Sequence, residues 1–491
     1  ATAGEVPHTT LLHERLNAQY AVRACNAAGC GDSALVQPNV AKAIGYFKAS
    51  NTHEDQQFGY SMALSADANT LAVGAPFEQG GSKGINGDEE DLGRPSSGAV
   101  YVYIRDAGGA WSKQAYIKAS NAEIGDLFGS TLALSADGNT LAVGAPLEDS
   151  DAVEVHVTPP VDEGAPDSGA VYMFSRSSGS WTEQAFVKAS NTERDDTFGL
   201  AVALSADGRT LAVGAPAEDG PSNGRMDAGA AYVYSRSGDA WEFEKQLAAS
   251  NSFQGRRFGT ALALSSNGDV LAARDPGMVY VFARDGADWS EQEIVQPDPP
   301  AGFIGRSIAL SGDGKTLAVG ADGDDSAATG VDNPSNEIAT DSGAVYVFAW
   351  NGADWVQQAY LKASNTGPGD EFGWSLSLSS DGNRLAVGAG SEDSAGKGFN
   401  NLQSDNGVLH AGAAYLFARE GLSWRQTSYV KASNTTSTKS PYGQQFGRTV
   451  VLSGDGNTLV VAGTTEESGA KGLNGDQADT SKPGSGAVYF Y

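Results

Sequence analysis

The sequence predicts an all-β protein, a seven-bladed β-propeller of four-stranded antiparallel blades, from three observations. A segment that begins with a glycine, mostly as Phe-Gly, recurs through the 491 residues. Each copy contains four short apolar runs separated by turn residues, and the last copy lacks its fourth run, which instead lies near the N-terminus. Long internal repeats built from four strand-like runs are typical of radially arranged blades. The leading glycines are Gly59, Gly129, Gly199, Gly259, Gly305, Gly373 and Gly447.

The second repeat shows how each strand is predicted. Its apolar runs are Ser130–Ser135, Thr140–Ala145, Ala170–Phe174 and Trp181–Ala189. Runs rich in Val, Leu, Tyr and Phe between Gly, Asp and Ser are typical of strands. Ala-Asp-Gly-Asn between the first two runs indicates a tight hairpin. The second run alternates weakly, as expected for a strand that neighbouring blades cover on both faces.

The two ends of the chain predict how the ring closes. The last repeat stops at Tyr491, after its third run, while Gly45–Ser50 matches the fourth-run segment Ala115–Ser120. We therefore expect the N-terminal strand to complete the last blade, so that no sheet edge is exposed. Tyr46 and Phe47 are expected in the core.

The repeats resemble the FG-GAP repeats of the integrin α-subunit propeller, and their Lys-Ala-Ser-Asn and Leu-Ser-x-Asp-Gly-Asn segments resemble the bacterial branch most. The resemblance covers residues 44–491 and implies the fold, whereas one fold hosts many activities. The Phe-Gly pairs that carry it are Phe58-Gly59, Phe128-Gly129, Phe198-Gly199, Phe258-Gly259, Phe372-Gly373 and Phe446-Gly447, with Gly-Ala-Pro at 74–76, 144–146 and 214–216.

Residues 1–38 are predicted to be separate from the propeller of residues 39–491. The segment around Tyr20 resembles the last strands of a fibronectin type III domain. Such a sandwich needs about 100 residues, so we expect an excerpt of a longer protein, or a partner that supplies the missing strands. Cys25 and Cys30, the only cysteines, lie across a predicted hairpin and suit a disulfide in an oxidising compartment. A two-cysteine metal site is the alternative.

The charge of −28 arises from 60 acidic and 32 basic residues. The acidic excess falls in the loops between second and third strands and in the connections from one blade to the next. Both emerge on one side of a propeller, which we name the loop face. An acidic face excludes nucleic acid and anionic membranes as partners. It favours divalent cations or a basic protein or glycan partner, with Glu89, Glu90 and Asp91 as candidate partner-binding residues; a merely solvated acidic rim is the alternative.

Calcium is the metal that these loops predict. The integrin-type Asp-rich hairpin is reduced here to single aspartates such as Asp137, and one carboxylate cannot supply the 6–8 oxygen ligands of Ca²⁺. The long loops of the second and fifth repeats are richer in carboxylates, which a loop closing on itself would bring together. The candidate ligands are Glu148, Asp149, Asp151 and Asp167, and Asp322, Asp324, Asp325 and Asp341.

No run approaches the ~20 apolar residues of a membrane span, and the composition suits a secreted or cell-surface bacterial protein. The five histidines show no catalytic spacing. We therefore expect a non-enzymatic extracellular propeller for binding, adhesion or assembly within a larger protein. The alternative is a carbohydrate-binding module or a polysaccharide-active enzyme. A catalytic site would need a compact His, Asp, Tyr or Arg cluster at the axis, and a glycan platform would expose aromatic residues, with Trp374 the one to watch.

Overall fold

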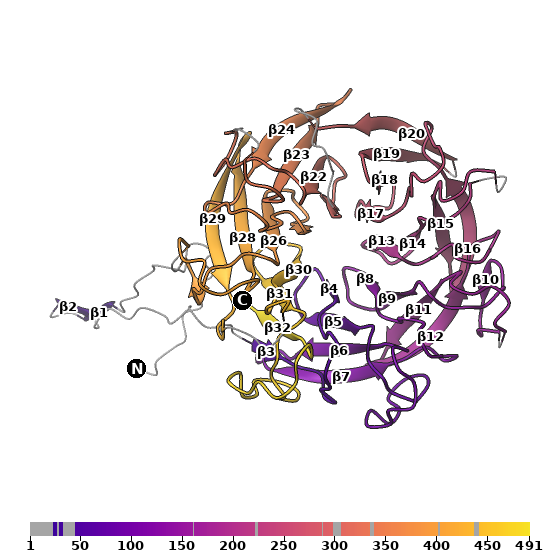
Figure 1. Ribbon diagram of the computed structural model, residues 1–491, viewed down its shortest axis with the longest axis horizontal. Helices are drawn as coiled ribbons and strands as arrows, with labels where there is room; N and C mark the ends of the chain where they lie inside the picture. The colour runs from indigo at the N-terminus through magenta and orange to yellow at the C-terminus, as the bar shows by residue number, and fades with distance from the viewer. Residues whose placement is uncertain are drawn as a thin grey trace.

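The seven-bladed ring is confirmed in the computed structural model, in which the described residues form strands and no helices (Figure 1). Each blade is an antiparallel sheet whose strands follow one another from the axis outward. The structure describes residues 23–26, 29–32, 45–160, 162–220, 224–286, 288–297, 306–333, 338–400, 403–436 and 441–491. Within these ranges no helix is long and apolar enough to cross a membrane.

The first three blades have these strands. The first contains β4 (Ser61–Leu64), β5 (Thr70–Ala75), β6 (Ala99–Arg105) and β7 (Trp111–Ile117). The second contains β8 (Thr131–Leu134), β9 (Thr140–Ala145), β11 (Ala170–Ser177), β12 (Ser180–Val187) and the short β10 (Val155–His156). The third contains β13 (Ala201–Leu204), β14 (Thr210–Ala215), β15 (Ala230–Ser237) and β16 (Ala240–Leu247).

The other four blades follow the same order. The fourth contains β17 (Ala261–Leu264), β18 (Val270–Asp275), β19 (Met278–Asp285) and β20 (Asp288–Val295), and the fifth β21 (Ile308–Leu310), β22 (Thr316–Ala321), β23 (Ala344–Trp350) and β24 (Trp355–Leu361). The sixth contains β25 (Ser375–Leu378), β26 (Arg384–Ala389), β28 (Ala413–Glu420), β29 (Ser423–Lys431) and the short β27 (Gly398–Phe399). The seventh combines β30 (Phe446–Leu452), β31 (Leu459–Gly463) and β32 (Ala487–Phe490) with β3 (Gly45–Phe47).

The N-terminal strand closes the ring, as predicted. β3 pairs with β32, and Tyr46 lies opposite Tyr489. Tyr46 and Phe47 are each 1% exposed, and Phe47 packs edge-on against Tyr103 of the first blade. The first and last segments of the propeller are therefore neighbours in one sheet.

The Phe-Gly signal marks the contact between consecutive blades. A Cβ on Gly74 would lie 2.2 Å from the carbonyl oxygen of Gly129, so the strands meet too closely for any other residue at position 74. Phe128 forms a backbone bridge to Gly98 of the preceding blade and packs edge-on against Tyr172 of its own. The repeated aromatic and glycine residues thus determine how blades stack.

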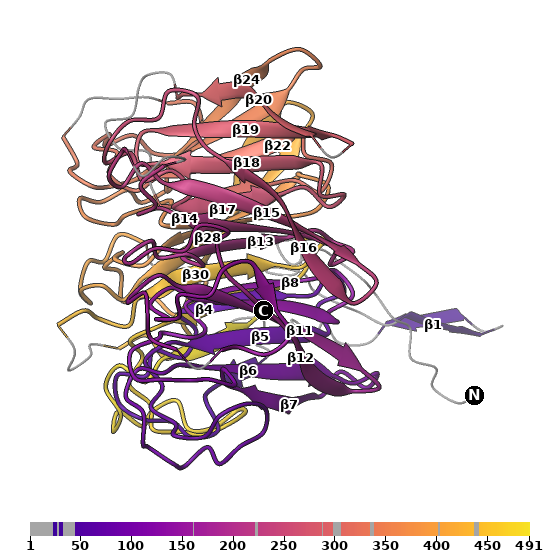
Figure 2. The ribbon, with the colours of Figure 1, turned by 90° about the vertical axis from the view of Figure 1, so that its right-hand side faces the viewer.

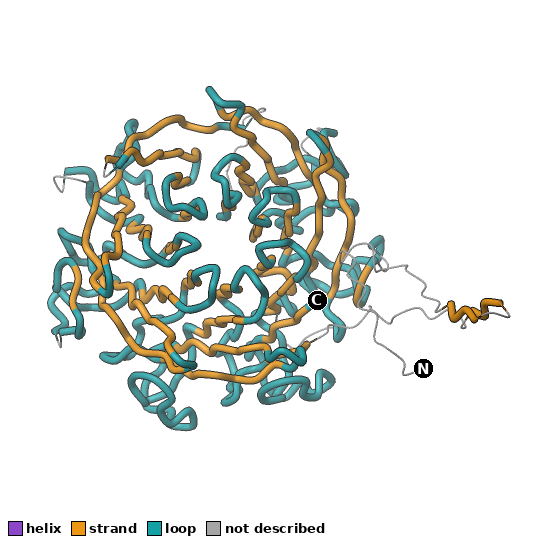
Figure 3. Tube along the Cα trace, turned by 180° about the vertical axis from the view of Figure 1, so that it is seen from behind, coloured by secondary structure: helices purple, strands orange, loops and turns teal. Residues whose placement is uncertain are grey.

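The two faces of the ring differ in their connections. In side view the long loops gather on one side and the tight turns on the other, which we name the hairpin face (Figure 2). Figure 3 shows the ring from behind, with strands in orange and loops and turns in teal. Several long loops fold back along the outer strand: β10 pairs with β12 and β27 with β29, giving two blades a fifth strand that the sequence did not predict. Single bridges such as Ile85 to Ile117 do the same elsewhere. These loops cover the outer edges of the sheets.

The fourth blade has the short loop that the sequence predicts, because Asp275 pairs directly with Met278. The connector that follows, including Gly305, lies partly outside the described residues. At the N-terminus, β1 (Arg23–Asn26) and β2 (Gly29–Asp32) pair with Cys25 opposite Cys30. The rest of residues 1–38 lies outside the described ranges, so the fibronectin resemblance, the domain boundary and the disulfide stay predictions.

Candidate functional site

Five blades, among the residues described, bury an ion pair at the base of the loop face. In each, the lysine of Lys-Ala-Ser-Asn at the end of the outer strand meets the acid at the start of the long loop. All five lysines are 0% exposed. Because an unpaired buried charge is strongly destabilising, each partner holds the other in place. The pairs are Lys48–Glu466 (2.9 Å), Lys118–Glu78 (2.7 Å), Lys188–Glu148 (2.9 Å), Lys362–Asp324 (3.2 Å) and Lys431–Glu392 (2.6 Å).

Among the described contacts, four of the five pairs belong to a network that joins neighbouring blades, because an asparagine of the preceding blade donates to the acid. Lys188 Nζ also donates to Ser168 Oγ at 2.7 Å, and Asn121 of the preceding blade donates to Glu148 at 3.1 Å. The hydroxyl of Tyr172 donates to the same asparagine. Sequence analysis missed this network, although its signal was the joint recurrence of Lys-Ala-Ser-Asn and of an acid three or four residues after the glycine near the end of the second strand. Acids that seemed to belong to a solvated rim are therefore structural.

Each of the four predicted calcium ligands of the second loop has a partner in the structure, either an ion pair or a hydrogen bond within the loop. Glu148 is bound to Lys188, while Asp149 Oδ1 accepts the backbone N–H of Asp167 at 2.8 Å. The loop therefore closes on itself, as predicted. Burial, then the charge of Asp149, raises the pKa of Asp167. Asp151 has a different partner: its backbone N–H donates to Asp162 Oδ1 at 2.8 Å.

The fifth loop repeats this arrangement. Asp324 faces Lys362, and Asp325 Oδ1 accepts the backbone N–H of Asp341 at 2.9 Å. Asp322 Oδ1 is buried without a hydrogen-bond partner. Among the described residues, no three His, Cys, Asp or Glu side chains are placed to hold a metal ion. Calcium binding stays a prediction.

The candidate partner-binding residues of the first loop also have contacts. Glu89 accepts hydrogen bonds from Lys113 Nζ and Ser50 Oγ. Glu90 pairs with Lys471 of the seventh blade at 2.9 Å, and this hydrogen bond lowers its pKa. Asp91 is exposed. The three residues lie on the loop face, where the first and seventh blades meet.

A cationic cluster lies at the axis of this acidic face. Arg306, Trp374 and Arg448, which we name the axial cluster, stand at the starts of the fifth, sixth and seventh blades, whose first strands are innermost (Figure 1). The guanidinium carbons of Arg448 and Arg306 lie 3.6 Å and 4.3 Å from the centroid of the Trp374 ring. Within the described chain, neither guanidinium has an ion pair or hydrogen bond. Burial lowers the pKa of Arg448, and the nearby Glu371 opposes that shift.

The axial cluster could not be read from local motifs, because its members come from three repeats. The sequence singled out Trp374, and the fold adds the two arginines. Tyr60, at the same position in the first blade, is 41% exposed and contributes to the electrostatic environment of Arg448. The sequence signal was therefore the residue that follows the leading glycine of each repeat, compared around the ring.

Comparisons with known proteins identify the class of the chain. A model of the FG-GAP repeat family matches residues 111–174, 181–234 and 355–417, each running from one outer strand to the third strand of the next blade. The chain thus carries FG-GAP repeats in a seven-bladed propeller. No curated protein matches it significantly.

Two solved structures are similar at the level of the fold. One is a Bacteroides uniformis protein described as a candidate 6-phosphogluconolactonase, with 12% identity, a TM-score of 0.44, and coverage of 76% of this chain and 86% of that chain. The other is the periplasmic gluconolactonase PpgL of Pseudomonas aeruginosa, with 16% identity, a TM-score of 0.44, and coverage of 85% and 93%.

The expectation of a non-enzymatic protein is corrected here. Both neighbours are described as lactonases, so a propeller of this kind does not exclude catalysis. Histidine spacing along the sequence does not test for catalysis, because residues from separate blades meet at the axis irrespective of sequence motifs. The likeness itself shows the fold alone.

Proposed function

We propose that this propeller is a recognition module of a secreted or cell-surface protein, and that its loop face binds a basic protein segment through one carboxylate. The observation that carries the proposal is the axial cluster: two arginines without a described ionic partner, held against Trp374 in the middle of an acidic face.

The chemistry of the arginines indicates a carboxylate. A guanidinium presents a planar fork of donors that matches a carboxylate in bidentate fashion. Stacking on Trp374 supports the orientation of both forks before the ligand arrives, which reduces the entropy lost on binding. Arg448 is partly desolvated, so its interaction with an anion is stronger than in water.

The surrounding charge selects the rest of the ligand. A polyanion is repelled by a protein of charge −28, whereas a lysine- and arginine-rich segment is attracted and steered toward the face. A basic peptide with a free C-terminal carboxylate satisfies both the rim and the axial cluster.

Two synthetic lysine-rich peptides of one sequence, one with a free C-terminal carboxylate and one amidated, test the proposal by calorimetric titration. We expect the carboxylate form to bind at least tenfold more tightly, with affinity falling as salt rises. In Arg306→Gln/Arg448→Gln the two peptides should bind alike. Arg425→Gln, which removes an exposed hairpin-face arginine paired with Glu420, should behave as wild type. Equal binding of both peptides to the wild type, or no binding, would overturn the proposal.

A further inference from the structure

A belt of hydrogen bonds joins adjacent blades near the hairpin face. In the second blade, Arg176 donates to Gln114 at 3.1 Å and to Thr70 at 3.0 Å, both of the preceding blade. The indole N–H of Trp181 donates to the same Gln114 at 2.9 Å. Arg284 and Trp289 bind Glu244 in the same way, and Arg419 and Trp424 bind Gln358.

The fifth blade departs from this belt. Trp350 takes the place of the arginine, and Val270 takes the place of the threonine in the preceding blade. Gln292, the equivalent of Gln114, has neither donor, and its amide nitrogen donates to Ser290 Oγ at 2.9 Å. Gln184 of the second blade is oriented in the same way, although Arg236 and Trp241 are present in the third blade. Within the described chain, nothing donates to Gln292 Oε1, and the indole N–H of Trp355 has no acceptor.

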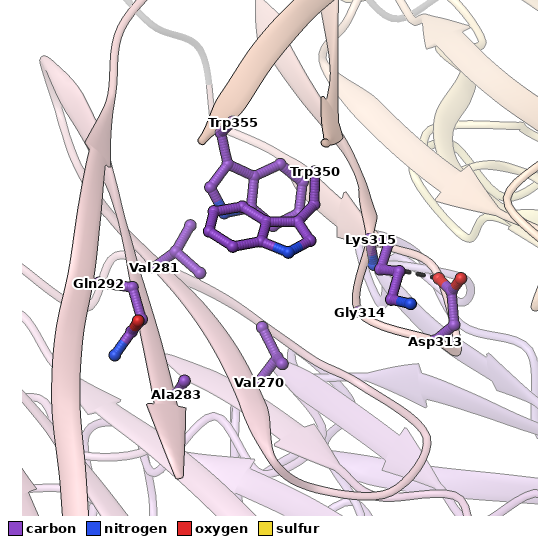
Figure 4. Close-up of a pocket in the computed structure, with 9 residues that line it drawn as sticks. All are labelled: Val270, Val281, Ala283, Gln292, Asp313, Gly314, Lys315, Trp350 and Trp355. Carbon is purple, nitrogen blue, oxygen red and sulfur yellow. Dashed lines mark hydrogen bonds between the residues drawn. The ribbon is translucent and has the colours of Figure 1, made fainter. Parts of the chain in front are cut away.

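These replacements open a pocket of about 190 Å³ between the fourth and fifth blades (Figure 4). Trp350 and Trp355 form one wall, with ring centroids 6.0 Å apart and planes tilted by 53°. Val270, Val281 and Gln292 lie across from them (Figure 4). An apolar cavity of about 150 Å³ accepts benzene, so this pocket has room for one six-membered ring.

At the rim of the pocket, a lysine replaces an asparagine that is found in four other blades. In four other hairpins the asparagine two residues after the turn aspartate donates to its Oδ2, as Asn139 does to Asp137 at 2.9 Å. Lys315 replaces that asparagine, so Asp313 keeps only the bonds to Oδ1, from Ser311 Oγ and the Lys315 backbone. Asp313 Oδ2 and the Lys315 ammonium are therefore available at the opening.

We propose that this pocket binds a neutral pyranose ring of a glycan. The two tryptophans offer aromatic faces to the C–H face of a sugar. Gln292 Oε1 and Asp313 Oδ2 accept from its hydroxyls, and Lys315 and the Trp355 N–H donate to them. A purely apolar ligand would cover Gln292 Oε1 and the Trp355 N–H without forming a hydrogen bond to either, and Asp313 disfavours an anionic one. The site lies on the face opposite the axial cluster and is independent of the function proposed above.

Titration of the full chain with the methyl glycosides of glucose, galactose, mannose and N-acetylglucosamine tests this inference. We expect at least one to bind with a Kd on the order of millimolar, as suits a ligand of one ring, and to change the tryptophan fluorescence. Benzyl alcohol serves as a ring without the pyranose hydroxyls.

The decisive variant restores the belt. Val270→Thr/Trp350→Arg reinstates the residues of other blades, so it should melt no lower than wild type and lose sugar binding at least tenfold. Gln292→Leu/Asp313→Ala keeps the aromatic wall and should also lose sugar binding. Leu422→Ala, an exposed hairpin-face change, should not. The proposal is overturned if no glycoside binds, if the restored belt binds as well as wild type, or if benzyl alcohol binds and the Gln292→Leu/Asp313→Ala variant leaves every affinity unchanged.

Discussion

Three aspartates, each two residues before a Phe-Gly pair, have pKa values that burial raises. Asp126, Asp196 and Asp370 are 2–5% exposed. Burial first, and then nearby acids such as Glu148, raises their pKa values to about 7, 8 and 8. In the first and seventh blades the same position holds a glutamine, Gln56 or Gln444. In the fourth blade it holds Arg256, which pairs with Asp275 at 3.2 Å. Burial therefore favours the neutral form only where the residue is an aspartate without a cationic partner.

Asp196→Asn tests this at the residue scale. A carboxyl whose folded pKa is about 8, against 3.8 ordinarily, binds its proton more tightly when folded. Its contribution is therefore complete below pH ~4 and is lost as pH rises through ~8. At pH 4 the variant should be as stable as the wild type. At pH 8.5 its free energy of unfolding should exceed that of the wild type by ~2 kcal/mol or more. Gln444→Asn is the control, because it changes the equivalent position without a titrating group. If Asp196→Asn changed the stability by the same amount at both pH values, the assignment would be refuted.

At the scale of elements, the long loops are hydrogen-bonded to the outer strands of the blades. Asn86, at positive φ, donates its backbone N–H to the Tyr116 carbonyl at 2.7 Å, and its side-chain oxygen accepts the Tyr116 N–H at 3.0 Å. Asn474 repeats both bonds with Tyr46. The loops therefore fold over the outer strand.

The calcium prediction belongs to these loops. If Asp149 with Asp167, and Asp325 with Asp341, recruit backbone oxygens and water around Ca²⁺, millimolar calcium should raise the melting temperature relative to EDTA. Asp167→Asn/Asp341→Asn should reduce that rise. Identical melting curves in calcium and EDTA, with no heat on titration, would remove calcium from these loops.

At the scale of the whole molecule, the N-terminal strand holds the ring closed. β3 supplies backbone pairing to β32, and Lys48 neutralises the buried Glu466 at 2.9 Å. Tyr46 donates its hydroxyl to the same carboxylate at 3.0 Å. Losing this strand would expose a sheet edge and leave a buried charge unpaired.

Deletion of residues 1–50 should therefore lower the melting temperature or cause aggregation. Deletion of residues 1–38 keeps the strand and serves as the matched control, with melting near that of the full chain. Scanning calorimetry with light scattering measures both. If the longer deletion melted like the shorter one, the ring would not depend on this closure.

The sequence by itself determined the fold, because its turns and Phe-Gly pairs act locally and recur in every blade. Thr140–Ala145 was predicted to the residue, and the closing strand followed from a missing fourth run. Local patterns carry this information since strand pairing within a blade joins segments that are close along the chain.

Only the tertiary structure decided which polar residues are buried in ion pairs and which meet at the axis. Glu148, a calcium ligand in the sequence-based prediction, lies buried against Lys188. Arg306 and Arg448 meet at Trp374 because the ring brings the starts of three blades to one axis. Charge and burial depend on neighbours from other repeats, and closure of the ring is what creates those neighbours.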